Sequence, residues 1–185
     1  MTAQADYFEL FSLPWRYEID RSALEAAYER LTLAHHPDFV ATAPEAERQE
    51  AERLSAAVNE GYRTLSRDAE RAAYLLGLLA GGRELNTTAL PPGFLQKMFG
   101  LQEEVEELGE VSDGGGDGRR AELRAEAEAE LETIQAERAR LFTQAGTEPG
   151  QAALEPLQAI QSNLNCERYL RRLLDRLDGQ RTDDD

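Results

Sequence analysis

Residues 24–38 of the chain read LEAAYERLTLAHHPD. Their apolar residues recur at intervals of three and four, which predicts an amphipathic helix with one buried stripe, made of Leu24, Ala27, Tyr28 and Leu31. This helix is expected to end just after His35, because the residue before Pro37 is pushed out of the α-helical region. The tripeptide His36-Pro37-Asp38 is therefore predicted to lie in a loop.

Three further helices are predicted around this one. The stretch DYFELFSLP at 6–14 favours a short helix, and Asp20 or Ser22 can cap the helix that follows. Pro44 suits the first turn of a third helix, and Ser66 predicts a capping box for a fourth. The predicted buried stripes are Leu54, Val58, Gly61, Tyr62 and Leu65 in the third helix and Ala69, Ala72, Ala73, Leu76 and Leu79 in the fourth.

The second half of the chain carries three longer helical patterns, at 94–109, 119–145 and 151–177. Their apolar seams predict an antiparallel three-helix bundle. These seams include Leu123, Ala127, Leu131, Ile134 and Leu141, facing Leu154, Leu157, Ile160, Leu164, Leu170, Leu173, Leu174 and Leu177. The chain is thus predicted to be all-α, with an N-terminal domain at 1–80, a linker at 81–93, a C-terminal bundle at 94–178 and a disordered tail at 179–185.

The composition argues against several classes of partner. The formal net charge of −16 opposes binding to nucleic acid or to an anionic membrane, because both depend on Lys and Arg. The single cysteine, Cys166, fits a reducing compartment. The N-terminal sequence has no secretory signal pattern, and the longest apolar run is too short to span a bilayer. A cytoplasmic protein is expected.

Both histidines of the chain, His35 and His36, stand side by side. A metal site is disfavoured because adjacent helical residues point about 100° apart and no further histidine exists, so no metal and no cofactor are predicted. Nucleophilic catalysis is disfavoured because no Ser or Cys lies beside the loop, so the chain is not predicted to be an enzyme. Two interpretations remain, a docking loop and a simple helix end where Pro37 stops the helix and Asp38 makes a turn.

The order and sequence of these first helices resemble the J-domain, the module through which J-proteins stimulate the ATPase of Hsp70 chaperones. The matching stretches are DYFELFSLP at 6–14, LEAAYERLTLAHHPD at 24–38 and NEGYRTLSRDAERAAYLL at 59–76. The resemblance implies that Hsp70 is contacted by His36, Pro37 and Asp38, together with Tyr28 and Arg30 of the preceding helix. That helix is less basic than is usual in J-domains, so the contact is expected to depend less on charge.

The whole chain, including PPGFLQKMFGLQEEVEEL at 91–108, resembles the bacterial type of HscB, the co-chaperone of iron–sulfur cluster assembly. The resemblance implies a J-domain and a three-helix bundle in an L-shaped molecule. It also implies two partners, an IscU-like iron–sulfur scaffold protein and an HscA-like Hsp70. Two alternatives stay open: a J-protein with a different client, and a helical adaptor with no Hsp70 role in which HPD only ends a helix.

In HscB proteins the first helix of the bundle binds the scaffold protein, which here assigns that role to Leu95, Gln96, Phe99, Glu103 and Glu107. Four of these residues are spaced four apart and so share one helix face. Periodicity alone also allows Leu95 and Phe99 to be core residues, with the glutamates as a solvated face. Under the binding interpretation, Met98 and Leu101 are the better candidates for burial in the core.

The resemblance also predicts an aromatic contact from the last helix, near Ala159 and Ile160. No aromatic residue stands there, and Tyr169 lies a turn or more further along.

Overall fold

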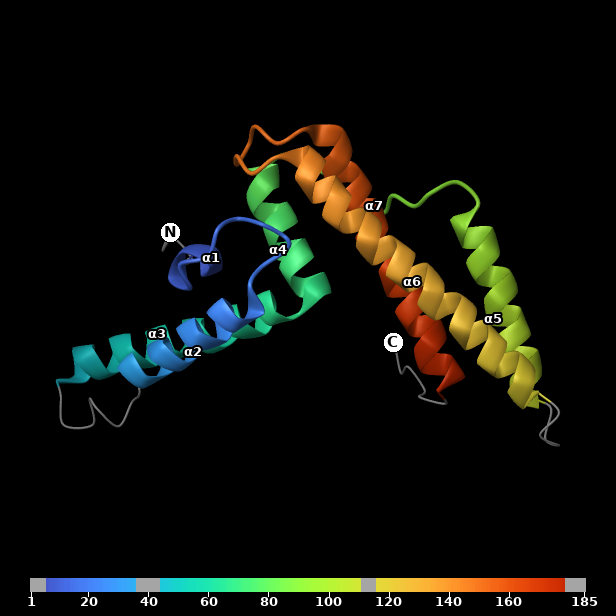
Figure 1. Cartoon of the computed structure of the whole chain (residues 1–185), viewed down its shortest axis with the longest axis horizontal. Coiled ribbons are helices and arrows are strands. Elements are labelled where there is room, and N and C mark those ends of the chain that lie inside the picture. Colours follow the sequence, from blue (N-terminus) through green and yellow to red (C-terminus); the bar gives the residue numbers. More distant parts are fainter. Residues whose placement is uncertain (1–5, 36–43, 111–115, 179–185) are drawn as a thin grey trace. The chain divides into compact units, whose positions relative to one another are not determined.

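The structure is a computed structural model that describes residues 6–35, 44–110 and 116–178. Within these ranges the regular elements are seven α-helices and no strand, as the all-α prediction required. The chain divides into two compact units, Met1–Leu78 and Leu79–Asp185, each with its own set of helices (Figure 1). None of the described helices combines the length and the apolar character needed to cross a bilayer.

The first unit contains four helices, and the first two of them start at side-chain caps. They are α1 (Tyr7–Leu10), α2 (Arg21–Ala34), α3 (Glu45–Ser66) and α4 (Asp68–Ala80), the last of which continues into the second unit. The Asp6 carboxylate accepts from the Phe8 amide, and the Asp20 carboxylate accepts from the Ala23 amide. Such caps satisfy backbone donors that have no partner inside the helix.

In the first unit α2 and α3 lie side by side, and α1 packs against α3 (Figure 1). The contact between α1 and α3 depends on Gly61, since a Cβ atom there would lie 2.8 Å from the Phe11 ring and 3.0 Å from the Tyr7 ring. The Tyr7 ring also stacks on Tyr74 at 4.8 Å, and the Tyr7 amide donates to the Tyr74 hydroxyl. The buried side chains at the centre are Phe8, Phe11, Leu24, Val58 and Leu65.

Three details of the first unit differ from the sequence predictions. Ser66 does not cap α4, because it belongs to α3 and its hydroxyl donates to the Arg63 carbonyl. Ala73 is exposed and Leu75 is buried instead, which rotates the buried stripe of α4. Of the two predicted capping candidates for α2, Asp20 takes the capping position, as the sequence allowed, and Ser22 lies inside the helix. Pro44 is the N-cap of α3 and does not lie within its first turn.

The second unit contains α5 (Phe94–Glu110), α6 (Asp117–Ala145) and α7 (Leu154–Leu177), close to the three predicted spans. Helices α6 and α7 form a long hairpin, and α5 packs on both of them (Figure 1). The hairpin can turn at Gly146, whose φ of 84° is a conformation that favours glycine.

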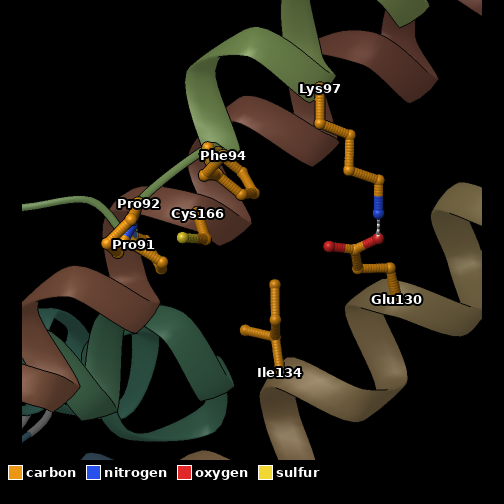
Figure 2. A pocket seen from close by; sticks show the side chains of 8 residues that line it. Pro91, Pro92, Phe94, Lys97, Glu130, Ile134 and Cys166 are labelled. Carbon is orange, nitrogen blue, oxygen red and sulfur yellow. Dashed lines mark hydrogen bonds and ion pairs between the residues drawn. The ribbon is translucent and has the colours of Figure 1, made fainter.

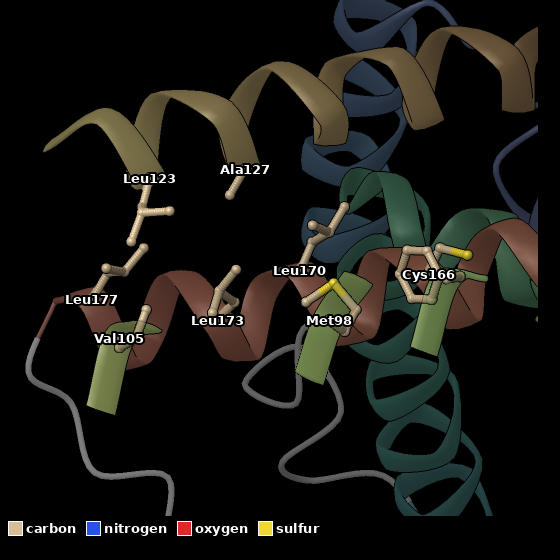
Figure 3. Packing of buried hydrophobic residues seen from close by; sticks show 9 residues of the cluster. Met98, Val105, Leu123, Ala127, Cys166, Leu170, Leu173 and Leu177 are labelled. Carbon is tan, nitrogen blue, oxygen red and sulfur yellow. The ribbon is translucent and has the colours of Figure 1, made fainter. Parts of the chain in front are cut away.

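Apolar side chains from all three helices form the core of the second unit (Figure 3). Met98 and Val105 enter it from α5, Leu123 and Ala127 from α6, and Leu170 and Leu173 from α7. The prediction for Leu154 was wrong, since 44% of this residue is exposed at the first turn of α7.

A buried ion pair joins α6 to α7 beyond the apolar seam. Arg138 and Glu167 are 0% and 2% exposed, and the guanidinium donates to the carboxylate. Arg138 also donates to the Asn163 side chain at 2.8 Å. Arg138 is a charged residue outside the predicted apolar seam, and such a residue is expected at the surface. This buried pair was therefore not predicted.

The segment 81–93, predicted as a linker, is attached to the α6–α7 hairpin by hydrogen bonds. The Arg83 guanidinium donates to the Ala152 carbonyl at 2.7 Å. The Asn165 amide donates to the carbonyls of Thr87 and Ala89 at 3.0 and 2.9 Å. The segment before α5 is therefore fixed to α7, because its backbone carbonyls accept hydrogen bonds from the Asn165 side chain.

Candidate functional site

The HPD tripeptide follows the C-terminus of α2. Helix α2 ends at Ala34, and the His35 amide caps it by donating to the Leu31 carbonyl at 3.0 Å. The predicted contact residues His36, Pro37 and Asp38 lie outside the described residues. The helix thus ends where the proline was expected to end it.

Tyr28, a predicted Hsp70 contact, takes part in the packing of α2 on α3. Its ring stacks on the Tyr62 ring with centroids 4.2 Å apart, and its hydroxyl donates to Asn59 at 2.9 Å. It is partly exposed, whereas Arg30 is exposed on the outer face of α2. Tyr28 therefore holds α2 against α3, and Arg30 is accessible to a partner.

The outer face of α2 carries mixed charge and one apolar side chain that the sequence analysis did not single out. Glu25, Glu29 and Arg30 are exposed, and Arg21 is tied to Asp68 at 3.0 Å. Leu33 is 67% exposed, more than any other large apolar residue described. Leu33 falls outside the predicted buried stripe of Leu24, Ala27, Tyr28 and Leu31, and this position in the sequence already indicated that it would be exposed.

On α5 the structure separates the two sets of apolar side chains. Met98 is 1% exposed in the core of the second unit (Figure 3), and Leu101 is partly buried against that core. Leu95 and Phe99 are 40% and 60% exposed. The core interpretation of Leu95 and Phe99, which periodicity allowed, was wrong.

Acidic and small residues surround this exposed pair. Glu103 and Glu107 are exposed further along the same face, and Gln96 is exposed beside Leu95. Gly100 has open space where a side chain would lie. The accessible face of α5 is therefore apolar at its first turns and anionic at its last ones.

Glu104 does not belong to this face. Its carboxylate accepts from Arg119 of α6 at 2.6 Å, and this hydrogen bond holds the pKa of Glu104 below its usual value. Glu106 is exposed and lies 3.7 Å from Arg176 of α7. Helix α5 is thus held on both flanks by ion pairs, with its outer face free to meet a partner.

The aromatic residue of α7 that lies beside α5 is Tyr169. Its ring meets the Phe94 ring edge-on, with centroids 6.0 Å apart. Ile160, near which the family pattern places an aromatic residue, is completely buried. Which residue of α7 lies opposite α5 depends on how far the two helices are shifted along each other. The spacing of apolar residues within one helix does not predict that shift.

A cavity of about 410 Å³ lies between α5, α6 and α7 (Figure 2). Phe94, Ile134 and Cys166 give it an apolar wall, and Lys97 pairs with Glu130 across one side. Burial raises the pKa of the Cys166 thiol to about 11, with a further contribution from the charge of Glu130. The thiol is therefore protonated at neutral pH and is a poor nucleophile.

Metal-binding groups are not assembled within the described ranges. No three His, Cys, Asp or Glu side chains in them are placed to hold one ion.

Comparison with known proteins gives a consistent result. The chain is 42% identical over 114 residues to the co-chaperone protein HscB homolog of Azoarcus sp., a match that covers 60% of this chain and 64% of the relative. That is less than two thirds of the relative's length. The HscB homolog of Ralstonia nicotianae is 34% identical over 179 residues, covering 96% of this chain and 98% of the relative. No family model matches the chain.

Solved structures show the same architecture. The chaperone HscB from Vibrio cholerae superimposes with a TM-score of 0.75 and 27% identity, over 95% of this chain and 96% of that one. The human co-chaperone HscB has a TM-score of 0.76 at 21% identity, over 97% and 84%, which supports the fold alone.

Proposed function

Since the chain belongs to the HscB family of co-chaperones, we propose that it joins an IscU-like iron–sulfur scaffold protein to an HscA-like Hsp70 and stimulates the ATPase of that Hsp70. Its place of action would be the cytoplasm, and the outcome would be transfer of the cluster to acceptor proteins. The observation that carries the proposal is the exposure of Leu95 and Phe99 on the acidic outer face of α5.

The scaffold would bind to α5. An exposed aromatic side chain is a common anchor of protein interfaces, and Phe99 stands at the centre of this face with Leu95 one turn before it. Glu103 and Glu107 would attract basic residues of the scaffold and so favour one partner over others. Gln96 and Gly100 would contribute contact without charge.

The Hsp70 would bind at the end of α2. Pro37 limits the freedom of the loop, and the Asp38 carboxylate is suited to accept charge-assisted hydrogen bonds from a cationic side chain of the Hsp70. The stacked Tyr28 and Tyr62 rings would keep the loop's base rigid while it docks. All ATP chemistry would belong to the Hsp70, and this chain would act without catalysis of its own.

Binding both partners at once would raise the concentration of scaffold near the Hsp70. The second binding event becomes intramolecular, so a weak direct affinity between scaffold and Hsp70 is sufficient. The stimulation by chain and scaffold together should then exceed the sum of their separate effects.

The test is the steady-state ATPase rate of the Hsp70 with the chain, with the scaffold and with both. We expect synergy that disappears with Asp38→Ala, while the affinity of this variant for the scaffold stays unchanged. Stimulation without synergy would indicate a different client. Absence of any stimulation would refute the J-domain role and leave HPD as a helix end.

A second variant tests the scaffold site separately. Phe99→Ala should weaken scaffold binding by about tenfold or more, the usual loss at an aromatic anchor, and should leave scaffold-independent ATPase stimulation intact. The Kd can be measured by titration calorimetry, with Gln144→Ala, at an exposed position of α6, as a control for general surface effects. An unchanged Kd would remove Phe99 from the interface.

A further inference from the structure

A cleft of about 190 Å³ lies in the second unit, next to the start of α5. Its walls are Thr88 and Leu90 from the segment before α5, and Asn165, Arg168, Tyr169 and Arg172 from α7. Pockets for drug-sized molecules measure about 300–1,000 Å³, so this cleft is suited to a smaller group such as a single side chain.

A buried side chain builds this cleft. Asn165 is only 5% exposed, and its amide nitrogen donates to the carbonyls of Thr87 and Ala89. Its amide oxygen accepts from the Arg168 guanidinium at 3.4 Å. One residue therefore fixes the wall of the cleft and orients the cation at its edge.

The charge of the cleft is opposite to that of the chain. Arg168 and Arg172 are four residues apart on α7 and so lie on the same face, in a protein of net charge −16. Neighbouring basic residues of α7 have carboxylate partners, such as Glu167 for Arg171 and Glu106 for Arg176. Among the described residues Arg168 bonds only to the neutral Asn165 amide.

The cleft lies next to the N-terminal end of α5. Tyr169, which lines the cleft, meets the ring of Phe94, the first residue of α5, edge-on. Leu90 of the cleft wall stands four residues before that helix begins. The exposed Leu95 belongs to the same first turn of α5, and Glu107 lies about 18 Å further along the helix from Leu95.

We propose that this cleft binds a carboxylate side chain of the same scaffold protein that docks on Leu95 and Phe99, an inference that rests on the proposed function. A guanidinium matches a carboxylate through two parallel hydrogen bonds, and Arg172 adds a second cation four residues away. Arg168 lies near the start of α5 and Glu107 lies near its end, so the two ends of the proposed binding surface carry opposite charges. A scaffold segment with an acidic and a basic end can bind it in one orientation only.

The test compares the scaffold Kd of the double variant Arg168→Gln/Arg172→Gln with that of Arg140→Gln, an arginine of α6 whose side chain is 76% exposed. The double variant should weaken binding about tenfold or more, because it removes charge-assisted hydrogen bonds, and the control should leave the Kd unchanged. Glutamine is as good a helix former as arginine, so circular dichroism should show full helicity in both variants.

The outcomes separate this inference from the proposed function. If Phe99→Ala weakens binding and the double variant does not, the carboxylate cleft is refuted and the α5 site stands. If the wild-type chain binds no scaffold, the proposed function fails, and a titration of the chain with a blocked tetraglutamate peptide decides about the cleft. A shift of the Asn165 side-chain amide resonances, absent in the double variant, supports the carboxylate site. No shift, or an equal shift with inorganic phosphate, refutes it.

Discussion

Neighbouring residues of α5 have opposite environments, and this contrast gives a prediction about stability. Met98 is 1% exposed and Phe99 is 60% exposed. Met98→Ala should lower the free energy of unfolding by about 2–5 kcal/mol, because it leaves a cavity in the core. Phe99→Ala should change it by less than about 0.5 kcal/mol, as is usual for surface positions. Urea unfolding measures both, and a large loss with Phe99→Ala would place that ring in the core.

The buried pair of Arg138 and Glu167 gives a prediction about pH. Burial raises the pKa of the Glu167 carboxyl, but the charges and hydrogen bonds of Arg138 and Arg171 together outweigh burial and hold that pKa below its ordinary value. The folded state therefore binds this proton less readily than the unfolded state does. The resulting stability is complete above the unfolded pKa of about 4.3 and is lost as the pH falls through the lower folded value.

Glu167→Gln should lower the free energy of unfolding at pH 7 by about 3–5 kcal/mol, because it leaves the Arg138 charge buried without its carboxylate. The variant should also lose less stability than the wild type between about pH 5 and pH 3, because it lacks this titrating group. Chemical unfolding at several pH values measures both effects. The control is Glu137→Gln, which removes an exposed pair with Arg140. Equal effects of the two substitutions would contradict the role of burial.

At the level of whole helices, two helical glycines differ in the space that the tertiary structure leaves around them. In α3 a Cβ on Gly61 would clash with the rings of Phe11 and Tyr7, whereas in α5 a Cβ on Gly100 would meet nothing within 4 Å. Gly100→Ala should stabilise the chain by about 1 kcal/mol through helix propensity. Gly61→Ala should instead destabilise it by about 1–3 kcal/mol through overpacking. Thermal unfolding followed by circular dichroism measures both, and the same sign for the two would contradict this account.

Helix boundaries were predictable wherever a local signal sets them. Asp20 caps α2 and His35 ends it, because a side-chain acceptor and a following proline act within a few residues. The start of α4 was not predictable in this way. Ser66 has the right residue type for a cap, yet it continues α3, since Asp68 begins the next helix two residues later.

For the whole molecule, the two proposed sites fall on separate compact units, Met1–Leu78 and Leu79–Asp185. A variant defective at one site should therefore sequester the partner of the other. Excess Asp38→Ala chain, added to wild-type chain, scaffold and Hsp70, should suppress the scaffold-dependent part of the ATPase rate, because it binds scaffold and does not deliver it.

The matched control for this competition is the double variant Asp38→Ala/Phe99→Ala, which should not suppress the rate because it binds scaffold poorly. Equal suppression by both variants would show that the competition acts at the Hsp70 and not through sequestered scaffold.

The sequence by itself determined which residues form helices, where α2 stops before HPD, and that Leu95, Phe99, Glu103 and Glu107 share one face of α5. These properties follow from periodicity, caps and proline, which act within one or two turns of chain. The tertiary structure alone decided that this face is open to a partner, and that Tyr169 of α7 packs on Phe94 at the start of α5 while Ile160 is buried. The same is true of the buried Arg138. The physical reason is that the rotation and offset of one helix against another depend on how distant side chains fill a shared core.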